Sequence, residues 1–168
     1  VGKAGGKHAV MGASLYNAGF EEEVSPEGQA EADAIPSEIR AEEIAKRRDF
    51  RGITTCTIDP IDAKDFDDAL SFSETEDKEG KKLYEIGVHI ADVSHYLRED
   101  SVLDKEAVRR ATSVYMVDRV IPMLPEVLSN DLCSLRPNED KLTFSAVFTL
   151  HADAHLIEEL FGRTILHY

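Results

Sequence analysis

The sequence predicts an α+β fold in which helices flank a mixed, mostly antiparallel sheet. Runs of β-branched and aromatic residues recur over much of residues 53–167, and short polar stretches separate them. That pattern is typical of strands joined by hairpins. Signals for helix starts gather instead in residues 21–49 and near residue 101. A chain of 168 residues suits one domain, or one domain with a short extension.

The first 49 residues are expected to precede the main domain. Residues 1–20 are rich in glycine, alanine and lysine and show no clear periodicity, which predicts a linker or a remnant of a preceding domain. Residues 21–49 hold ten acidic and four basic residues. Ser25, followed by proline, predicts a helix start, and Pro36 predicts the end of that helix before a second one over residues 38–48. We interpret residues 21–49 as an acidic helical lead-in segment with a solvated face.

Residues 50–168 carry the strand pattern and are expected to form the main domain. The expected strands cover residues 53–58, 66–72, 83–91, 112–117, 142–150 and 156–167. The polar run 73–82, which contains a glycine, predicts a hairpin loop. Ser101, with Asp104 three residues later, resembles a capping arrangement and predicts a helix that ends near Ala111. Residues 126–135, after a turn bracketed by two prolines, predict a short helix.

Composition favours a folded, acidic, cytoplasmic protein. Hydrophobic residues make up 42% of the chain, enough for a core, and no apolar run approaches the ~20 residues of a membrane span. The start is rich in glycine and lysine and does not resemble a signal peptide. We interpret the absence of an initiator methionine as the sign of an excised fragment. Cys56 and Cys133 do not form a disulfide framework, and with His151 and His155 they lack the spacing of a zinc site. The net charge of -14 argues against nucleic-acid binding by bulk electrostatics.

Five aspartates occur within ten positions, directly after the first expected strand. They are Asp59, Asp62, Asp65, Asp67 and Asp68. In a strand, Asp65 and Asp67 would point to one face and Asp68 to the other. Carboxylates this close repel one another, so a folded cluster needs protons or a counter-ion. A hard divalent cation such as Mg²⁺ or Mn²⁺ suits several clustered oxygens, and this predicts phosphate-ester chemistry.

The alternative to a metal site is an exposed acidic loop, because aspartate is common in turns. Against this, Phe66, Ala69 and Leu70 interrupt the acidic residues, so some carboxylates would lie beside buried side chains at a large desolvation cost. The EF-hand pattern does not fit, since the fifth position from Asp65 is Ala69 and no glycine follows. The DxD of haloacid-dehalogenase-like phosphatases should follow a strand directly, whereas residues 63–64 intervene here.

Four blocks of sequence resemble the catalytic domain of the ribonuclease II/ribonuclease R family, in the family's order. The first block joins Thr57-Ile58-Asp59 to Asp65-Phe66-Asp67-Asp68-Ala69. The others are Gly87-Val88-His89-Ile90-Ala91-Asp92-Val93-Ser94, Val120-Ile121-Pro122-Met123-Leu124-Pro125 and Leu128-Ser129-Asn130-Asp131-Leu132-Cys133-Ser134-Leu135. The resemblance covers residues 50–168 and implies the amino-terminal part of an RNB-type catalytic domain. Residues 21–49 are similar to the acidic helical segment that leads into this domain in ribonuclease R.

The resemblance implies a processive 3′-to-5′ exoribonuclease that uses Mg²⁺ to hydrolyse RNA to nucleoside 5′-monophosphates. It implies that Asp59, Asp65, Asp67 and Asp68 form the acidic metal site, with direct ligation expected of Asp67 or Asp68. Tyr115 matches the family tyrosine that stacks on the base at the RNA 3′ end, a contact that tolerates any sequence. Taken alone, Tyr115 would be a core or edge-strand aromatic. The implied partner is the 3′ end of single-stranded RNA.

Four further polar residues have structural interpretations. His89 lies among apolar neighbours on an expected strand, which is typical of a hydrogen-bonded core histidine. We treat Asp92, three residues later, as structural. Arg136 and Asn138 follow the last of the four blocks, where they could contact phosphate or have ordinary surface roles.

The chain ends well before the family's catalytic domain does. The later part of that domain is implied to supply an arginine and a glutamate to the active site, and separate cold-shock and S1 domains supply much of the basic surface. We therefore expect the parent protein to be an exoribonuclease and this chain to be inactive alone. A truncated sheet would leave an edge that pairs with a second copy. Two alternatives share the acidic residues: a metal-dependent phosphatase-like hydrolase and a non-catalytic acidic interaction module.

Overall fold

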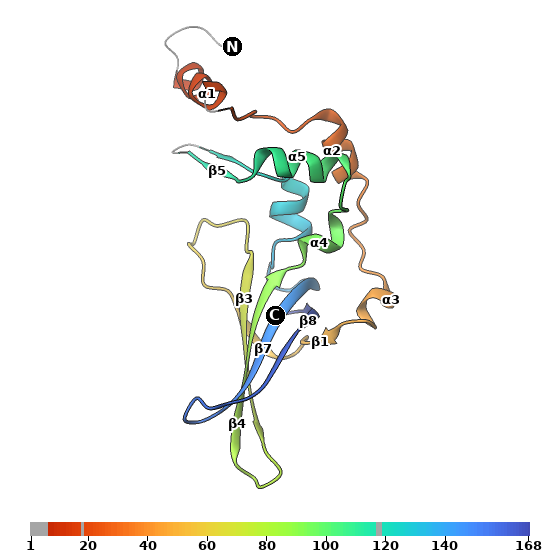
Figure 1. Cartoon of the computed structure of the whole chain (residues 1–168), viewed down its shortest axis with the longest axis vertical. Helices are drawn as coiled ribbons and strands as arrows, with labels where there is room; N and C mark the ends of the chain where they lie inside the picture. The colour runs from red at the N-terminus through yellow and green to blue at the C-terminus, as the bar shows by residue number, and fades with distance from the viewer. Residues whose placement is uncertain (1–6, 18, 117–118) are drawn as a thin grey trace. The chain divides into compact units, whose positions relative to one another are not determined.

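The computed structural model describes residues 7–17, 19–116 and 119–168. The chain forms two compact units, each assembled from two separate stretches (Figure 1). The smaller unit combines Val1–Ile35 with Leu97–Glu126, and the larger combines Pro36–Tyr96 with Val127–Tyr168. No helix within the described residues is long and apolar enough to cross a membrane.

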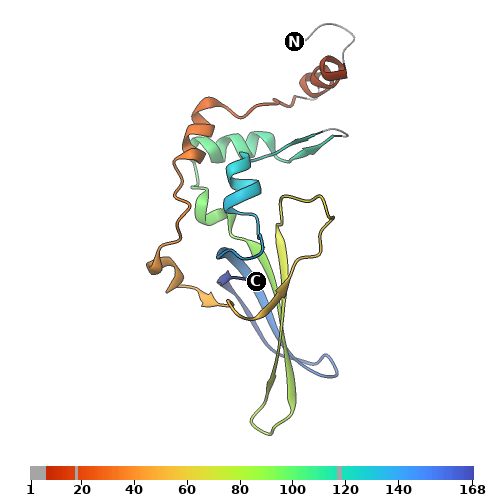
Figure 2. The same cartoon turned by 180° about the vertical axis from the view of Figure 1, so that it is seen from behind.

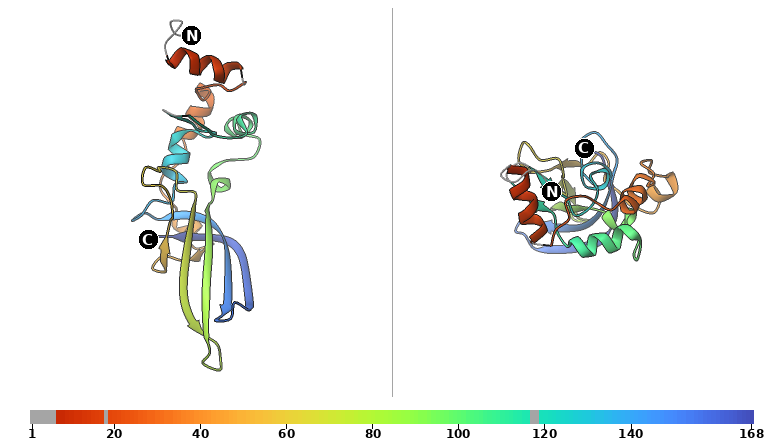
Figure 3. Two further views of the ribbon diagram at one scale, coloured as in Figure 1. Left: turned by 90° about the vertical axis from the view of Figure 1, so that its left-hand side faces the viewer. Right: turned by 90° about the horizontal axis from the view of Figure 1, so that it is seen from above.

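The larger unit is built on a six-stranded sheet. Its strands are β1 (Arg48–Asp49), β2 (Thr54–Cys56), β3 (Asp68–Glu76), β4 (Lys82–Ala91), β7 (Lys141–His151) and β8 (Leu156–Leu166). They lie in the order β1-β8-β7-β4-β3-β2, and each neighbouring pair is antiparallel except β1 with β8. The long hairpins β3–β4 and β7–β8 lie side by side and twist along their length (Figure 3). This sheet confirms the predicted α+β fold with mostly antiparallel strands.

Most elements of the larger unit form where the sequence predicts them, with shifted ends. β4, β7 and β8 occupy the predicted strands, and β3 runs four residues further than expected, to Glu76, so the hairpin loop is shorter. The predicted helix over 126–135 is a π-helix, η1 (Val127–Leu132). A short helix, α4 (Val93–Tyr96), follows β4.

The predicted helix over residues 38–48 is wrong. The chain forms a single turn, α3 (Ala41–Ile44), and then enters β1. β1 pairs in parallel with Thr164 and Ile165 of β8. Arg47 turns inward and donates hydrogen bonds to two backbone carbonyls of the sheet. These tertiary contacts outweigh the local helix preference of the segment, which is weak in comparison.

A chain of polar side chains crosses the buried face of the sheet. His89 on β4 lies between the hydroxyl groups of Ser71 on β3 (2.8 Å) and Ser145 on β7 (2.6 Å), and Ser145 also bonds Thr164 on β8. Burial lowers the pKa of His89 to about 4, so the ring is neutral at pH 7. A Cβ at Gly87 would lie 2.4 Å from His89 Nε2, so this position requires glycine. The structure confirms His89 as a hydrogen-bonded core histidine.

Asp92, directly after β4, forms a buried ion pair with Arg47. The Arg47 guanidinium lies 2.7 Å from Asp92 Oδ2, and the Ser94 hydroxyl donates to Asp92 Oδ1 at 2.8 Å. Burial alone would raise the pKa of Asp92, but the hydrogen bonds from Arg47 and Ser94 and the charges of Arg47 and Arg163 lower it below its usual value. The pair joins the segment before β1 to the end of β4, which confirms a structural role for Asp92.

The smaller unit contains helices and a two-stranded sheet. Its elements are α1 (Lys7–Asn17), α2 (Pro26–Asp33), α5 (Val102–Arg110), β5 (Val114–Tyr115) and β6 (Val120–Ile121). The Ser25 hydroxyl accepts from Gly28 N–H and the Ser101 hydroxyl from Asp104 N–H, both at 3.1 Å. Both predicted helix starts are therefore confirmed, whereas α1 lies in a segment without clear periodicity and was not predicted.

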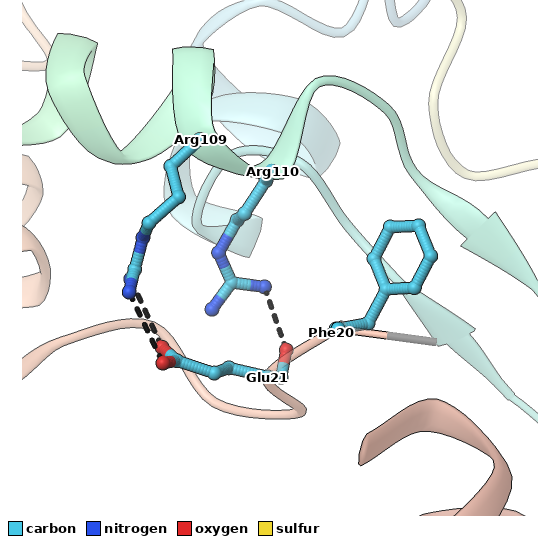
Figure 4. A pocket seen from close by; sticks show the side chains of 5 residues that line it. Phe20, Glu21, Arg109 and Arg110 are labelled. Carbon is cyan, nitrogen blue, oxygen red and sulfur yellow. Dashed lines mark hydrogen bonds and ion pairs between the residues drawn. The ribbon is translucent and has the colours of Figure 1, made fainter. Parts of the chain in front are cut away.

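A pocket on the smaller unit is lined by Gly19, Phe20, Glu21, Arg109 and Arg110 (Figure 4). Arg109 donates two hydrogen bonds to the Glu21 carboxylate, at 3.0 and 2.9 Å, and Arg110 donates to the Glu21 carbonyl at 3.1 Å. The two guanidinium groups therefore hold the segment before α2 against α5.

Asp92→Asn is expected to lower the free energy of unfolding by about 3–5 kcal/mol, because it leaves the buried Arg47 charge without its partner. Since the folded pKa of Asp92 is lowered, the pair stabilises the wild type above the ordinary carboxylate pKa of about 4, and this contribution disappears as the pH falls through the folded value. Urea denaturation between pH 3 and 7 measures both effects. The control is Glu74→Gln, which removes an exposed pair with Lys82 and should cost less than about 1 kcal/mol.

Candidate functional site

The aspartate-rich segment is the connection between β2 and β3. Residues 57–67, all of which the structure describes, form neither helix nor strand (yellow in Figure 2). Asp59, Asp65 and Asp67 lie on this loop, whereas Asp68 is the first residue of β3. The prediction that Asp65 and Asp67 alternate within a strand is wrong, because β3 begins only where residue 68 pairs with Ile90 of β4.

The end of the loop is held by hydrogen bonds on two sides. On one side, Ala91 N–H of β4 donates to the Asp67 carbonyl at 2.9 Å. On the other, Leu135 N–H donates to the Phe66 carbonyl at 2.8 Å. The Ser134 hydroxyl accepts from Phe66 N–H at 3.1 Å and donates to the Lys64 carbonyl at 2.9 Å. The backbone that carries Asp65 and Asp67 is thus fixed although it belongs to no strand.

Three of the aspartates act electrostatically on the fourth, Asp67. Burial raises the pKa of Asp67, and the negative charges of Asp65, Asp68 and Asp59 raise it further, although the side chain still reaches solvent. Ionised Asp67 is therefore disfavoured until a positive charge compensates for its neighbours. The exposed Asp62 is absent from the groups that perturb Asp67.

A second observation concerns Asp59. Its Oδ2 atom is buried and lacks a hydrogen-bond partner among the described residues. A buried carboxylate oxygen without a partner carries a large desolvation cost, which a cation would remove. Hard divalent cations prefer carboxylate oxygens, so the donor set of this loop fits Mg²⁺ or Mn²⁺.

The carboxylates do not form a closed metal-binding cluster in this structure. Within the described part of the chain, no three His, Cys, Asp or Glu side chains are arranged to hold a metal ion. The negative charges of Asp65, Asp68 and Asp59 oppose a closer approach to ionised Asp67.

Tyr115 lies on β5, in the other compact unit from the aspartates. Its side chain is 68% exposed, so it is no core residue, and its aromatic face can reach a partner. Arg136 pairs with the carboxylates of Asp131 and Glu139, the latter at 3.1 Å, which favours the surface role over phosphate binding.

Two residues near the aspartates were missed by sequence reasoning. Ser134 belongs to the last of the four blocks, and its contacts with Lys64 and Phe66 cross about seventy positions of sequence. The Tyr168 hydroxyl donates to the Leu135 carbonyl at 2.6 Å, beside the same contact. The sequence signal for Ser134 was its place in the last of the four blocks that resemble the family. That signal does not identify which residues the serine contacts.

Comparison of the sequence with known proteins identifies relatives over most of its length. Residues 47–168 match the RNB domain. Ribonuclease R 1 from Lactococcus lactis subsp. lactis is 48% identical over 136 residues, which cover 81% of this chain and 16% of the relative. DIS3-like exonuclease 2 from Xenopus tropicalis is 47% identical over 132 residues, which cover 79% of this chain and 15% of the relative. The chain thus spans about a sixth of the length of these relatives.

Solved structures share the fold. RNase R from Mycoplasma genitalium, in complex with ribose-methylated single-stranded RNA, matches 94% of this chain and 24% of its own with a TM-score of 0.80 and 27% identity. Yeast Ssd1, a pseudonuclease, matches 97% of this chain and 20% of its own with a TM-score of 0.76 and 21% identity, which shows the fold alone. Because the RNB match covers most of the residues, this protein belongs to the RNB domain family.

Proposed function

We propose that this chain is the amino-terminal part of the catalytic domain of a processive 3′-to-5′ exoribonuclease, which hydrolyses RNA to nucleoside 5′-monophosphates. The observation that carries this proposal is the hydrogen-bonded loop at the start of β3, where the charges of Asp65, Asp68 and Asp59 act on Asp67, in a chain of the RNB family. Relatives named ribonuclease R and DIS3-like exonuclease 2, and the RNA complexes of Mycoplasma genitalium RNase R, support RNA as the substrate.

Asp59, Asp65, Asp67 and Asp68 would hold Mg²⁺, or Mn²⁺ in its place. The orphaned Asp59 oxygen and the raised pKa of Asp67 both favour a bound cation. A divalent cation at such a site lowers the pKa of a water and stabilises a leaving 3′ oxygen. The task of this chain is to fix the carboxylates in place before the substrate arrives, so that no reorganisation is needed during the reaction.

Tyr115 would stack on the base at the 3′ end of single-stranded RNA. Its exposed ring offers a flat face to any base, which suits an enzyme that degrades RNA of any sequence. The net charge of -14 gives little attraction for the phosphate backbone. We therefore propose that basic surface elsewhere in a longer protein holds the RNA, and that the 168-residue chain alone is inactive.

Two alternative functions share the acidic loop. A metal-dependent phosphatase-like hydrolase would hydrolyse a phosphate monoester and leave RNA intact. A non-catalytic acidic interaction module would need no cation and would tolerate replacement of Asp68. The held geometry of residues 64–67 favours a catalytic site over an interaction module, because a solvated acidic surface needs no such restraint.

In the full-length enzyme, Asp68→Asn is expected to lower the rate of RNA shortening by more than about 100-fold, the scale of losing one preorganised charge from an active site. The substrate is 5′-labelled single-stranded RNA with Mg²⁺, and the wild type should shorten it stepwise from the 3′ end. Asp62→Asn is the matched control, since this neighbour is exposed and should leave the rate within about threefold.

Intact RNA with well-folded wild-type enzyme would refute the exoribonuclease proposal. Hydrolysis of a phosphate monoester by the same preparation would then support the phosphatase alternative. Equal rates for Asp68→Asn and wild type would remove Asp68 from the site.

Asp67→Asn is expected to raise the free energy of unfolding of the metal-free chain at pH 7. Because the folded pKa of Asp67 is raised, its ionised form destabilises the fold above that pKa, and the cost vanishes below the ordinary carboxylate pKa of about 4. Added Mg²⁺ should stabilise the wild type more than the variant. Urea denaturation with and without Mg²⁺ checks both; a variant that is less stable than wild type without Mg²⁺ would contradict this prediction.

We also propose that the isolated chain self-associates through the outer edge of β8. The Ile165 carbonyl points away from β7, because it accepts a hydrogen bond from Phe50 N–H. By the alternation of strand backbone groups, Glu159, Phe161 and Arg163 point their N–H and C=O groups the same way. In the described part of the chain, β1 covers only the carboxyl end of this edge. Unpaired strand edges are sites of intermolecular pairing.

Antiparallel pairing of two copies about Phe161 would be self-complementary. Phe161 would face its counterpart, and Glu159 of each copy would face Arg163 of the other. All three side chains are exposed, Phe161 by 61%. Aromatic pairs and opposite charges directly across an antiparallel ladder stabilise it, and the pairing has the two-fold symmetry of a closed dimer.

Glu159→Arg is expected to weaken the dimer about tenfold, because two favourable charge pairs of up to about 1 kcal/mol each become repulsive. Glu158→Arg is the control, since adjacent residues of a strand point to opposite faces. Light scattering over a range of concentrations measures the association; a monomeric mass for the wild type throughout would rule out this edge.

A further inference from the structure

Ser134 joins the end of η1 to the aspartate loop through one hydroxyl group. The side chain is completely buried. Its Oγ accepts a hydrogen bond from Phe66 N–H and donates one to the Lys64 carbonyl, so it bridges the peptide groups on either side of Asp65. A hydroxyl is the smallest side-chain group that can donate and accept at once, which this position requires.

We propose that Ser134 is a positioning residue for the metal site, whose hydroxyl sets the backbone of residues 64–67 and thereby the directions of the Asp65 and Asp67 carboxylates. This inference rests on the proposed Mg²⁺-dependent function. Ser134 would not contact the metal or the RNA itself. It acts through the main chain of the residues that do.

The need for such a restraint follows from electrostatics. The charges of Asp65, Asp68 and Asp59 all act against ionised Asp67, and this repulsion favours an open loop. β3 begins only at Asp68, so the ladder with β4 cannot restrain Asp65. The hydrogen bond from Ala91 to the Asp67 carbonyl fixes one end of the stretch. The Ser134 hydroxyl fixes the other.

Two other buried serines serve as controls. They separate the loss of stability that follows from removing any buried hydroxyl from a specific effect on the metal site. Ser145 and Ser71 are 1% and 3% exposed, and their hydroxyls bond His89 rather than the aspartate loop. Loss of any of these hydroxyls leaves a buried polar group without its partner. Only the loss of the Ser134 hydroxyl is expected to weaken metal binding.

The test measures Mn²⁺ binding to the 168-residue chain by isothermal titration. Ser134→Ala is expected to weaken Mn²⁺ binding at least tenfold, the usual scale for losing a group that orients metal ligands. Ser134→Cys replaces the hydroxyl by a slightly larger thiol, which is a poor hydrogen-bond donor, so it should show the same loss. Ser134→Thr keeps the hydroxyl and should retain binding. Ser145→Ala should bind Mn²⁺ like the wild type despite its own loss of stability.

Hydrogen–deuterium exchange at the Phe66 amide gives a second readout that needs no metal. Its protection should fall in Ser134→Ala and persist in Ser145→Ala. Equal protection in Ser134→Ala and wild type, or equal Mn²⁺ affinity of the two, would overturn the positioning role. Failure of the wild type to bind Mn²⁺ would instead refute the proposed metal site, and the exchange experiment would still decide whether Ser134 holds the loop.

Discussion

The structure depends on holding together carboxylates that repel one another. Asp59, Asp65, Asp67 and Asp68 lie on one loop and the first residue of the strand that follows, and their combined charge disfavours ionised Asp67. Such an arrangement costs stability in the metal-free chain. It persists because the backbone around it is tied to β4, to the Ser134 hydroxyl and to Leu135 N–H by hydrogen bonds in which the aspartate carboxylates take no part.

The sheet behind the loop supplies the rigidity that this requires. A continuous polar chain from Ser71 through His89 and Ser145 crosses three neighbouring strands, and the Arg47–Asp92 pair ties the segment before β1 to the end of β4. β4 also carries Ala91, whose N–H holds the Asp67 carbonyl. Buried polar networks of this kind favour one arrangement of the strands, because any slip would leave several groups unsatisfied.

Proteins that share this fold do not all share one activity. Yeast Ssd1 shares the fold with a TM-score of 0.76 and is a pseudonuclease, whereas Mycoplasma genitalium RNase R shares it with a TM-score of 0.80 and has been solved with RNA. The proposed hydrolytic activity therefore rests on the aspartates of the present chain, on the buried Oδ2 atom of Asp59, unpaired among the described residues, and on the hydrogen bonds that hold residues 64–67. Membership of the RNB domain family alone would not support the proposed hydrolytic activity.

Local sequence patterns were sufficient to predict the features that depend on neighbouring residues. The strands that became β4, β7 and β8, the caps at Ser25 and Ser101, and the identity of the acidic residues could all be predicted, because periodicity, capping and composition are local properties. Tertiary contacts limit the expected helix over residues 38–48 to α3, pair Arg48 and Asp49 with β8, and start β3 at Asp68. They also bring the Ser134 hydroxyl to the aspartate loop. These features arise from contacts between residues far apart in the chain, whose energies exceed local preferences and leave no pattern in the sequence around them.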